Sequence, residues 1–467
     1  VFSIRVGTDS STPSTEGSPT EEVSATEARY VGTAVVSAAA QASVSSQPQN
    51  AYFGELHVHT NWSLDAYRNG NLDGPAVAYR YGRGDAITRP DGSVRAQLRV
   101  PLDFMAVTDH DLWLGEIHLC EDVNDSAYNT PACRNLREIR TSGPGPDDFG
   151  FGITLGRFAR TLESGWRSRI GETATRPPEI CGESGFSPDN KCYERSKHLW
   201  HEIQRNADAF YQPGTFTTFP AYEFTAQPAG IGHLHRVVIF RGEEVPEWGG
   251  GTAEMGHRPE RLWEWLDVAC TGKCEVLAIP HNTNWSQGVA FAPRNSDGTP
   301  FTEEILTQRA AAEPLVEIFQ IKGNSECHIG LGTVDEECNF ELYYPACAPG
   351  QVASEEQDEG CAFPADYVRN ALKTGLTVEA QYGVNPFKYG VVASTDDHKS
   401  MSGATDEQTF TSKFGRMGVA QDQKSGQIRP FGELFGGNIT NPGGLAGVWA
   451  AGNTRESIFD AMKRREA

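Results

Sequence analysis

The chain has 467 residues and a formal net charge of −22 at neutral pH. This length is enough for one large domain or for two to three ordinary ones, with ample apolar material for a core. An acidic surface repels polyanions, so the charge argues against nucleic acid and anionic membranes as partners. The sequence holds no run of 18 or more apolar residues, and we therefore expect no membrane span.

Residues 1–50 are rich in Ser, Thr, Ala and Glu and contain few aromatic side chains. Such a segment buries too little apolar surface to offset the entropy that is lost when it is ordered. We therefore expect residues 1–50 to be a flexible, low-complexity leader and residues 51–467 to form the folded domain.

The ten cysteines cluster in stretches rich in Pro, Gly and Asp. Their even number and their placement fit local disulfides in an oxidising compartment better than reduced thiols. Neighbouring pairs such as Cys181 with Cys192 and Cys270 with Cys274 are the ones we expect, although the sequence does not fix the connectivity. A zinc ribbon would need two CxxC knuckles, and there are none. The cysteines thus predict a periplasmic or extracellular protein.

Short apolar runs rich in β-branched and aromatic residues begin at Phe53 and recur along the chain. Several are hydrophobic throughout, which is typical of strands buried on both faces of a largely parallel sheet. The expected strands occupy residues 53–60, 103–110, 216–225, 235–240, 275–282, 314–320 and 389–398.

Helix-like stretches lie between these runs, and the last of them opens at a Thr-x-x-Ser cap. Strands that alternate with helices over this length predict an α/β protein, either a barrel or a doubly wound sheet. Two segments, about 120–190 and 325–365, carry much Gly, Pro, Asp and Cys, and we expect them to be insertions pinned by disulfides. The expected helices occupy residues 191–210, 258–270, 365–381 and 454–466.

Side chains that bind metals stand at or just past the ends of the expected strands. His57 and His59 are two residues apart, so on a strand they point the same way. In barrel enzymes the carboxyl ends of the strands open on one face, which would gather all these groups. They are His57, His59, Asp109, His110, Glu223, His233, His235, His281, Glu317, Asp396, Asp397 and His398.

Imidazoles together with carboxylates suit Zn²⁺, Mn²⁺ or Fe²⁺, whereas Ca²⁺ prefers oxygen ligands alone. Two or three such ions held close together lower the pKa of a bridging water and clamp the oxygens of a phosphoryl group. A hydroxide made in this way needs no Ser or Cys nucleophile, and the chain holds neither a GxSxG motif nor a P-loop. Each motif alone is common as a strand-ending turn, but four of them at strand ends in one chain predict a metal centre.

Five segments resemble, in order, the signature segments of the polymerase and histidinol phosphatase (PHP) superfamily. Two more resemble an uncharacterised, usually exported branch of PHP-like proteins. The resemblance covers roughly residues 52–467 and is specific as an ordered set. The segments are ELHVHTNWSLDA, FMAVTDHD, FPAYEFT, IPHN and ASTDDH for the superfamily, and LHRVVIF and FQIKGNSECHIGLG for the branch.

This resemblance implies a distorted TIM-like (β/α)7 barrel that holds up to three metal ions. Asp65 stands where many relatives have histidine, and His235 is preferred to His233 because it directly precedes the apolar RVVIF run. Carried over by position, the three ligand sets are His57, His59, Glu223 and Asp396; Glu223, His235 and His281; and Asp65, His110 and His398.

Residues next to these ligands are expected to assist them. The resemblance implies that Asp109 hydrogen-bonds a ligating histidine, which would fix its tautomer. Lys322, just after a strand, could clamp an oxyanion of the substrate. An ordinary loop role is the alternative for each. Expected substrate-binding residues are Asn282, Asn284, Asn324 and Ser325.

We therefore expect an exported hydrolase that holds two to three divalent ions (Zn, Mn or Fe). Its expected nucleophile is a metal-bound hydroxide, and its expected substrate is a small anionic ester, above all a phosphoester. The alternatives are a hydrolase of another anionic ester, such as a sulfate, or of an amide, and a secreted, non-catalytic metal-binding or structural barrel protein. The intact ligand set favours the enzyme. The sequence leaves the oligomeric state open.

Overall fold

The structure is a computed structural model. The chain divides into two units, Val1–Ser46 and Gln47–Ala467, and the described residues belong to the second. The expected leader therefore lies outside the described residues, apart from its last two positions, Gln49 and Asn50. The described residues are 49–68, 70–142, 177–182, 190–228, 232–248, 250–351, 361–405, 419–421, 428–430 and 442–467.

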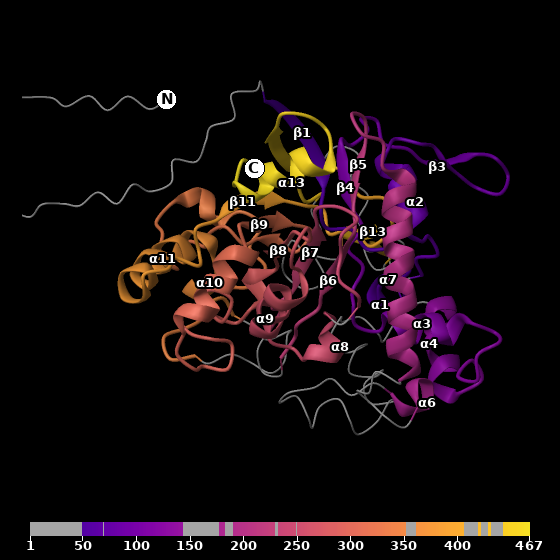
Figure 1. Cartoon of the computed structure of the whole chain (residues 1–467), viewed down its shortest axis with the longest axis horizontal. Helices are drawn as coiled ribbons and strands as arrows, with labels where there is room; N and C mark the ends of the chain where they lie inside the picture. Colours follow the sequence, from indigo (N-terminus) through magenta and orange to yellow (C-terminus); the bar gives the residue numbers. More distant parts are fainter. Residues whose placement is uncertain are drawn as a thin grey trace, which may run out of the picture. The chain divides into compact units, whose positions relative to one another are not determined.

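The second unit is a mixed α/β fold, as the sequence predicts (Figure 1). Its strands are β1 (Asn50–Glu55), β2 (Ile87–Thr88), β3 (Val94–Ala96), β4 (Phe104–Ala106), β5 (Thr217–Phe219), β6 (Ala221–Phe224), β7 (Arg236–Phe240), β8 (Val276–Pro280), β9 (Leu315–Gln320), β10 (Gly323–Asn324), β11 (Gly390–Ala393), β12 (Val419–Gln421), β13 (Ile428–Pro430) and β14 (Ala446–Ala450). Its helices are α1 (Leu64–Arg68), α2 (Pro75–Gly82), α3 (Leu114–Glu121), α4 (Pro131–Ser142), α6 (Pro178–Cys181), α7 (Lys191–Phe210), α8 (Thr252–Met255), α9 (Pro259–Ala269), α10 (Glu303–Ala312), α11 (Val368–Tyr382) and α13 (Arg455–Lys463), with 3-10 turns η1 (Thr283–Trp285), η2 (Glu336–Asn339) and η4 (Pro364–Asp366).

Three small sheets contain the strands that lead to the expected site. One has the order β14-β1-β4-β5, the second β6-β7-β8 and the third β10-β9-β11. Pairing is parallel between β1 and β4, between β4 and β5, and between β9 and β11. No sheet among the described residues closes on itself by hydrogen bonds.

The expectation of a largely parallel sheet is wrong for β7, which runs antiparallel to both β6 and β8. A parallel neighbour needs a long crossover, usually a helix, whereas the connection from β6 to β7 is residues 225–235, whose described part holds no helix. β14 also pairs antiparallel with β1. β7 is buried along its whole length, so its composition alone does not reveal its direction. β14 was not among the expected strands, and its burial alternates.

The predicted helices and strands lie close to those observed. α7 spans the residues expected, and Asn190 caps it by accepting hydrogen bonds from the backbone N–H groups of Cys192 and Tyr193. Thr454 caps α13 in the same way, through the N–H of Ser457. β1 ends at Glu55 rather than at residue 60, because the backbone N–H of Val58 turns to the Thr108 hydroxyl instead of a sheet neighbour.

All ten cysteines form disulfides, and the two expected pairs, Cys181–Cys192 and Cys270–Cys274, are confirmed. Cys181–Cys192 joins the end of the first expected insertion to α7, whereas both disulfides of the second insertion close loops within it. Five disulfides fit a protein of an oxidising compartment. The other three pairs are Cys120–Cys133, Cys327–Cys338 and Cys347–Cys361. Separately, no helix in the described part of the chain combines the length and apolarity that crossing a membrane requires.

Close packing of β1 against β4 depends on Gly54. A Cβ atom at this position would lie 2.3 Å from the carbonyl oxygen of Phe104. We expect Gly54→Ala to push the two strands apart and to lower the free energy of unfolding by about 1–3 kcal/mol, measured by guanidinium denaturation. Gly242→Ala is the control, since a Cβ there meets nothing within 4 Å. Equal losses in the two variants would contradict this role of Gly54.

Candidate metal centre

Segments that follow three strands, β1, β4 and β11, meet a fourth strand, β6, at the centre. Val58, after β1, forms an isolated parallel bridge with Asp397, after β11. His110, after β4, forms another with Glu223 of β6. These bridges bring together histidines and carboxylates that lie up to 340 positions apart in the chain. The structure thus places the nine predicted ligands in one cluster.

Four buried atoms face one another at the middle of this cluster. They are Nε2 of His57, Nε2 of His59, Oε2 of Glu223 and Oδ1 of Asp396. Each nitrogen lies 3.0–3.5 Å from each oxygen, yet none of the four atoms makes a hydrogen bond. Ligand atoms of a tetrahedral Zn²⁺ site, about 2.0–2.2 Å from the ion, lie about 3.4 Å apart. The set therefore fits a divalent ion at its centre.

The outer hydrogen bond of His59 fixes which of its nitrogens faces inward. Its Nδ1 lies 2.8 Å from the Ser63 hydroxyl, which itself donates to Asp109 at 2.7 Å. Since the hydroxyl proton is used on Asp109, Nδ1–H of His59 must be the donor to Ser63. The inward Nε2 then carries a lone pair, which is the form that binds metal.

His281 and His398 are oriented in the same way. Their Nδ1 atoms lie 3.3 and 2.8 Å from the carbonyl oxygens of Ile279 and Asp396, which only accept. Burial lowers the pKa of both imidazoles, so the neutral forms prevail and Nε2 carries a lone pair. These Nε2 atoms lie 2.9 Å from Glu223 and 2.8 Å from Asp65. A lone pair that faces a carboxylate at this distance calls for a cation between them.

The carboxylates around His57 give the centre a negative potential. Its Nδ1 lies 3.0 Å from Oε2 of Glu317. Burial opposes a charge on this ring, but Glu317 and Glu223 outweigh burial and raise the pKa of His57 to about 9. The carboxylates therefore attract positive charge, which a proton or a metal ion supplies.

Glu223 connects the first ligand set to the second. Its Oε2 faces His57 and His59, while its Oε1 lies 2.6 Å from Nδ1 of His235 and 2.9 Å from Nε2 of His281. A carboxylate with histidines on both oxygens has the geometry of a bridge between two ions. The ring of His233 lies 4.5 Å from that of His235.

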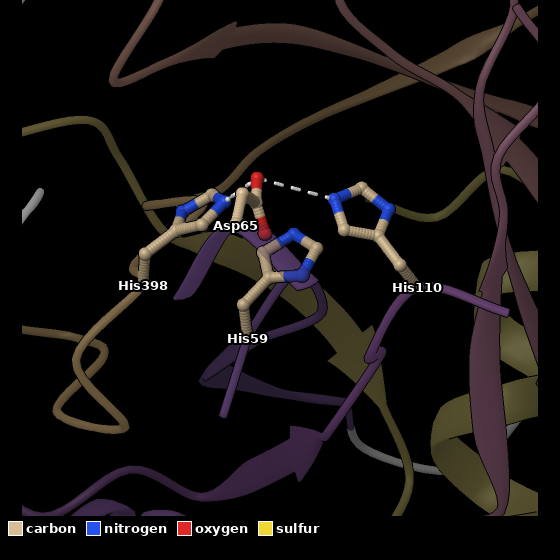
Figure 2. A group of neighbouring side chains, drawn as sticks. All are labelled: His59, Asp65, His110 and His398. Carbon is tan, nitrogen blue, oxygen red and sulfur yellow. Dashed lines mark hydrogen bonds and ion pairs between the residues drawn. The ribbon is translucent and has the colours of Figure 1, made fainter. Parts of the chain in front are cut away.

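The third set forms the exposed side of the centre (Figure 2). Asp65 reaches the Nε2 atoms of His398 and His110 at 2.8 and 3.4 Å, and His59 completes a group whose ligand atoms all lie within 4.8 Å of one another. The side chains of Asp65 and His110 are 15% and 13% exposed, whereas His235 and Glu223 are 5% and 1% exposed. Solvent therefore reaches the cluster beside Asp65.

The backbone at Asp396 is strained. Its φ of 52° lies in the left-handed region, which costs energy for any residue with a Cβ. The side chain is held on its outer oxygen, Oδ2, by Lys322 and by Gln320 Nε2, the latter at 2.9 Å. These contacts leave Oδ1 directed at His57 and His59.

The expected assisting residues are held mainly by other protein groups. Asp109 accepts from Thr60 and Ser63 and so reaches His59 through Ser63 rather than directly, because the Ser63 hydroxyl lies between them. Lys322 is 6% exposed, and burial lowers its pKa to about 8. It contacts the ligand Asp396.

The four residues expected to bind substrate make polar contacts with other residues of the protein. Asn282, with a left-handed φ of 50°, contacts Gln320. Asn284 donates to the Lys322 carbonyl and accepts from the Ser325 hydroxyl, each at 3.0 Å. The Asn324 side chain accepts from the N–H groups of Glu326 and Cys327. These residues shape the loop around Lys322.

Two residues of the centre were not predicted in their roles, Glu317 as the partner of His57 and Ser63 as the partner of His59. Both left a signal in the sequence. Glu317 interrupts the apolar strand PLVEIFQ, where a buried carboxylate needs a partner. Ser63 stands four positions after His59, within reach of a turn.

Comparisons with known proteins place the chain in a family. A family model described as a protein of unknown function (DUF3604) matches residues 46–467. The chain belongs to the DUF3604 family. No curated protein and no solved structure matches it. The matched residues of this DUF3604 chain include every member of the metal centre.

Orientation of His59 by Ser63 has a measurable effect. We expect Ser63→Ala to weaken Zn²⁺ binding by about 10- to 100-fold, because His59 loses the group that fixes its tautomer. Competition against a chromophoric chelator measures this affinity. Ser93→Ala is the control, because the Ser93 hydroxyl donates to Asp91 in an exposed turn. An unchanged affinity in Ser63→Ala would contradict the proposed orientation.

Proposed function

We propose that this DUF3604 protein is a multinuclear metal-dependent hydrolase that acts on phosphoesters. One observation carries the proposal: the inward nitrogen lone pairs of His59, His281 and His398 face carboxylate oxygens at 2.8–3.2 Å. Without cations, these contacts would be repulsive in a buried site. The mixture of imidazole and carboxylate suits Zn, Mn or Fe.

The ligand sets would hold two to three ions. His57, His59, Glu223 and Asp396 would hold the first, and Glu223 would share the second with His235 and His281. Asp65, His110 and His398 would hold the third. Ions bound by these residues would supply an activated water and would neutralise charge that develops on a phosphoryl group.

The chain's own residues position these groups and the substrate. Ser63, Glu317 and two backbone carbonyls keep the imidazoles oriented, which is required for fixed geometry at a reacting centre. Lys322 places a positive charge beside Asp396, near the Asp65 side where the centre is exposed. A cation in a buried site favours an anionic ester over a neutral amide.

We also propose that the strands form a distorted barrel of the PHP type. Its seven strands would be β1, β4, β5 and β6 taken together as one, β7, β8, β9 and β11. One buried apolar cluster supports this, because it receives a side chain from every one of these strands or from the residue next to it. Its members from them are Leu56, Phe104, Ala106, Phe219, Ala221, Val237, Ile239, Leu277, Ile279, Leu315 and Val392. The five disulfides support a periplasmic or extracellular location.

Elemental analysis tests the metal centre. We expect two to three equivalents of Zn, Mn or Fe in the purified protein and less than one in a His57→Ala, Asp396→Ala double variant. The control is His198→Ala, His201→Ala, which removes two exposed histidines of α7. Less than one equivalent in the wild type, or equal contents in wild type and double variant, would overturn the metal centre.

Hydrolysis is tested on the metal-loaded protein with a panel of phosphate, sulfate and amide substrates. We expect the phosphate esters to have the highest kcat/KM, and the double variant to lose at least about 100-fold, since removal of charge-stabilising groups costs this much. Faster turnover of sulfate esters would replace the phosphoesterase assignment. A fully loaded protein that hydrolyses none of the panel would instead support the non-catalytic, metal-binding alternative.

A further inference from the structure

An aromatic wall stands beside the metal centre. We define it as Trp285, which ends η1, together with Tyr343 and Tyr344. The Trp285 ring lies 4.4 Å from that of Tyr343 and 6.4 Å from that of Tyr344. The two tyrosine rings lie 4.6 Å apart, edge to face. Trp285 is buried, whereas both tyrosines are partly exposed.

The aromatic wall adjoins groups that contact the ligands. The ring of His233 lies 4.9 Å from Trp285 and 4.5 Å from the ligand His235. The ammonium group of Lys322, which contacts the ligand Asp396, lies 5.9 Å from the centre of the Trp285 ring. An ester whose anionic part is near Lys322 therefore has aromatic surface within reach of its organic part.

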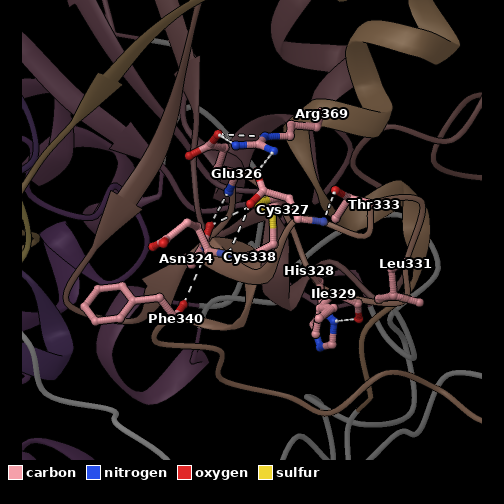
Figure 3. Close-up of a disulfide and its surroundings, with 12 residues drawn as sticks. Asn324, Glu326, Cys327, His328, Ile329, Leu331, Thr333, Cys338, Phe340 and Arg369 are labelled. Atoms are coloured by element: carbon pink, nitrogen blue, oxygen red, sulfur yellow. Dashed lines mark hydrogen bonds and ion pairs between the residues drawn. A yellow bond between two sulfur atoms is a disulfide. The ribbon is translucent and has the colours of Figure 1, made fainter.

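The second insertion carries the tyrosines, and Figure 3 shows its first disulfide, Cys327–Cys338, with Asn324 and Phe340 beside it. Gly323, with a φ of 87°, follows Lys322, and a Cβ there would lie 2.3 Å from the Glu341 carbonyl oxygen. The backbone N–H of Asn324 donates a hydrogen bond to the carbonyl oxygen of Glu341. Its side-chain amide donates another to the carbonyl oxygen of Phe340. The close approach at Gly323 therefore fixes the stretch that precedes Tyr343 against the chain next to Lys322.

Disulfides hold the stretch from both sides. Cys327–Cys338 closes the loop before the tyrosines, and Cys347–Cys361 anchors the chain after them. Between the two, His328 Nε2 lies 3.1 Å from the carbonyl oxygen of Tyr344. The two partly exposed tyrosines thus lie between two disulfides, and Tyr344 also packs against the small buried cluster of Leu331, Ala362 and Tyr367.

Trp285 also presents an unused donor. Its ring is 8% exposed, and its Nε1 is buried without a hydrogen-bond partner. A buried N–H that makes no hydrogen bond is costly and is rare in folded proteins. A ligand with an acceptor atom would satisfy it. The wall therefore combines aromatic surface with a polar atom that suits a bound molecule.

We propose that the aromatic wall binds a planar aromatic group on the alcohol side of the ester, so that this enzyme prefers aryl-bearing phosphoesters. This rests on the proposed function and adds the class of substrate. Aromatic rings associate face to face or edge to face with bound aromatic groups, which a saturated ring of the same size does less well. Tyr343, partly exposed and in contact with Trp285, sets the preference.

Benzyl phosphate and cyclohexylmethyl phosphate form a matched pair of substrates. Both release a primary alcohol, and their rings have the same number of carbons, so their difference reports mainly on aromaticity. We expect the metal-loaded wild type to favour benzyl phosphate by at least about 10-fold in kcat/KM. Tyr343→Ala should reduce this ratio to below about 3-fold, mainly through KM, with unchanged metal content.

Tyr343→Phe keeps the ring and should keep the ratio. Tyr382→Ala is a control that removes a partly buried tyrosine of α11, which packs against Phe301. A ratio near one in the wild type, or the same ratio in wild type and Tyr343→Ala, overturns the aromatic preference and leaves the hydrolase assignment intact.

A metal-loaded protein that hydrolyses neither ester overturns the proposed function, and the wall is then tested by binding. Isothermal titration compares benzylphosphonate with cyclohexylmethylphosphonate, which are not hydrolysed. Tighter binding of the aromatic phosphonate that is lost in Tyr343→Ala supports the aromatic wall. Equal affinities overturn it.

Discussion

Facing lone pairs are the constraint on which the rest of this structure depends. The Nε2 lone pairs of His59, His281 and His398 approach carboxylate oxygens within 3.2 Å in a largely buried region, and atoms that only accept repel one another there. Folding can bring them together only if a cation balances them and if the surrounding chain resists their separation. The bridges between Val58 and Asp397 and between His110 and Glu223 provide that resistance through the backbone.

Orientation comes from a layer of hydrogen bonds outside the ligands. Ser63, Glu317 and the carbonyls of Ile279 and Asp396 each occupy the outer nitrogen of one histidine. Three of these partners lie within four positions of their histidine and the fourth, Glu317, is on β9, so the rings have little freedom to turn. Asp396 is oriented in a similar way, because Lys322 and Gln320 contact its outer oxygen and hold the side chain in place despite the strained backbone.

Helices, strands and disulfides that depend on residues close together in the chain could be predicted from the sequence. Apolar runs and caps placed α7, α13 and most strands that lead to the site within a few residues, but they merged β5 with β6 and missed β14. Short spacing identified Cys181–Cys192 and Cys270–Cys274. The nine ligand positions came from ordered motifs, and the structure gathers them. The direction of β7 was missed, because burial on both faces looks the same whichever way a strand runs. Glu317 and Ser63 were missed as partners because a hydrogen bond across 260 positions, or around a turn, follows from the fold and not from the motif.

The five disulfides follow one rule along the chain: each cysteine pairs with the next one, first with second, third with fourth, and so on to the tenth. Each bond spans at most 14 positions. A chain that enters an oxidising compartment with its N-terminus first presents each correct partner before any later cysteine has arrived. Oxidation in order of arrival therefore yields the native set directly, and the pairing requires no exchange between bonds that have already formed.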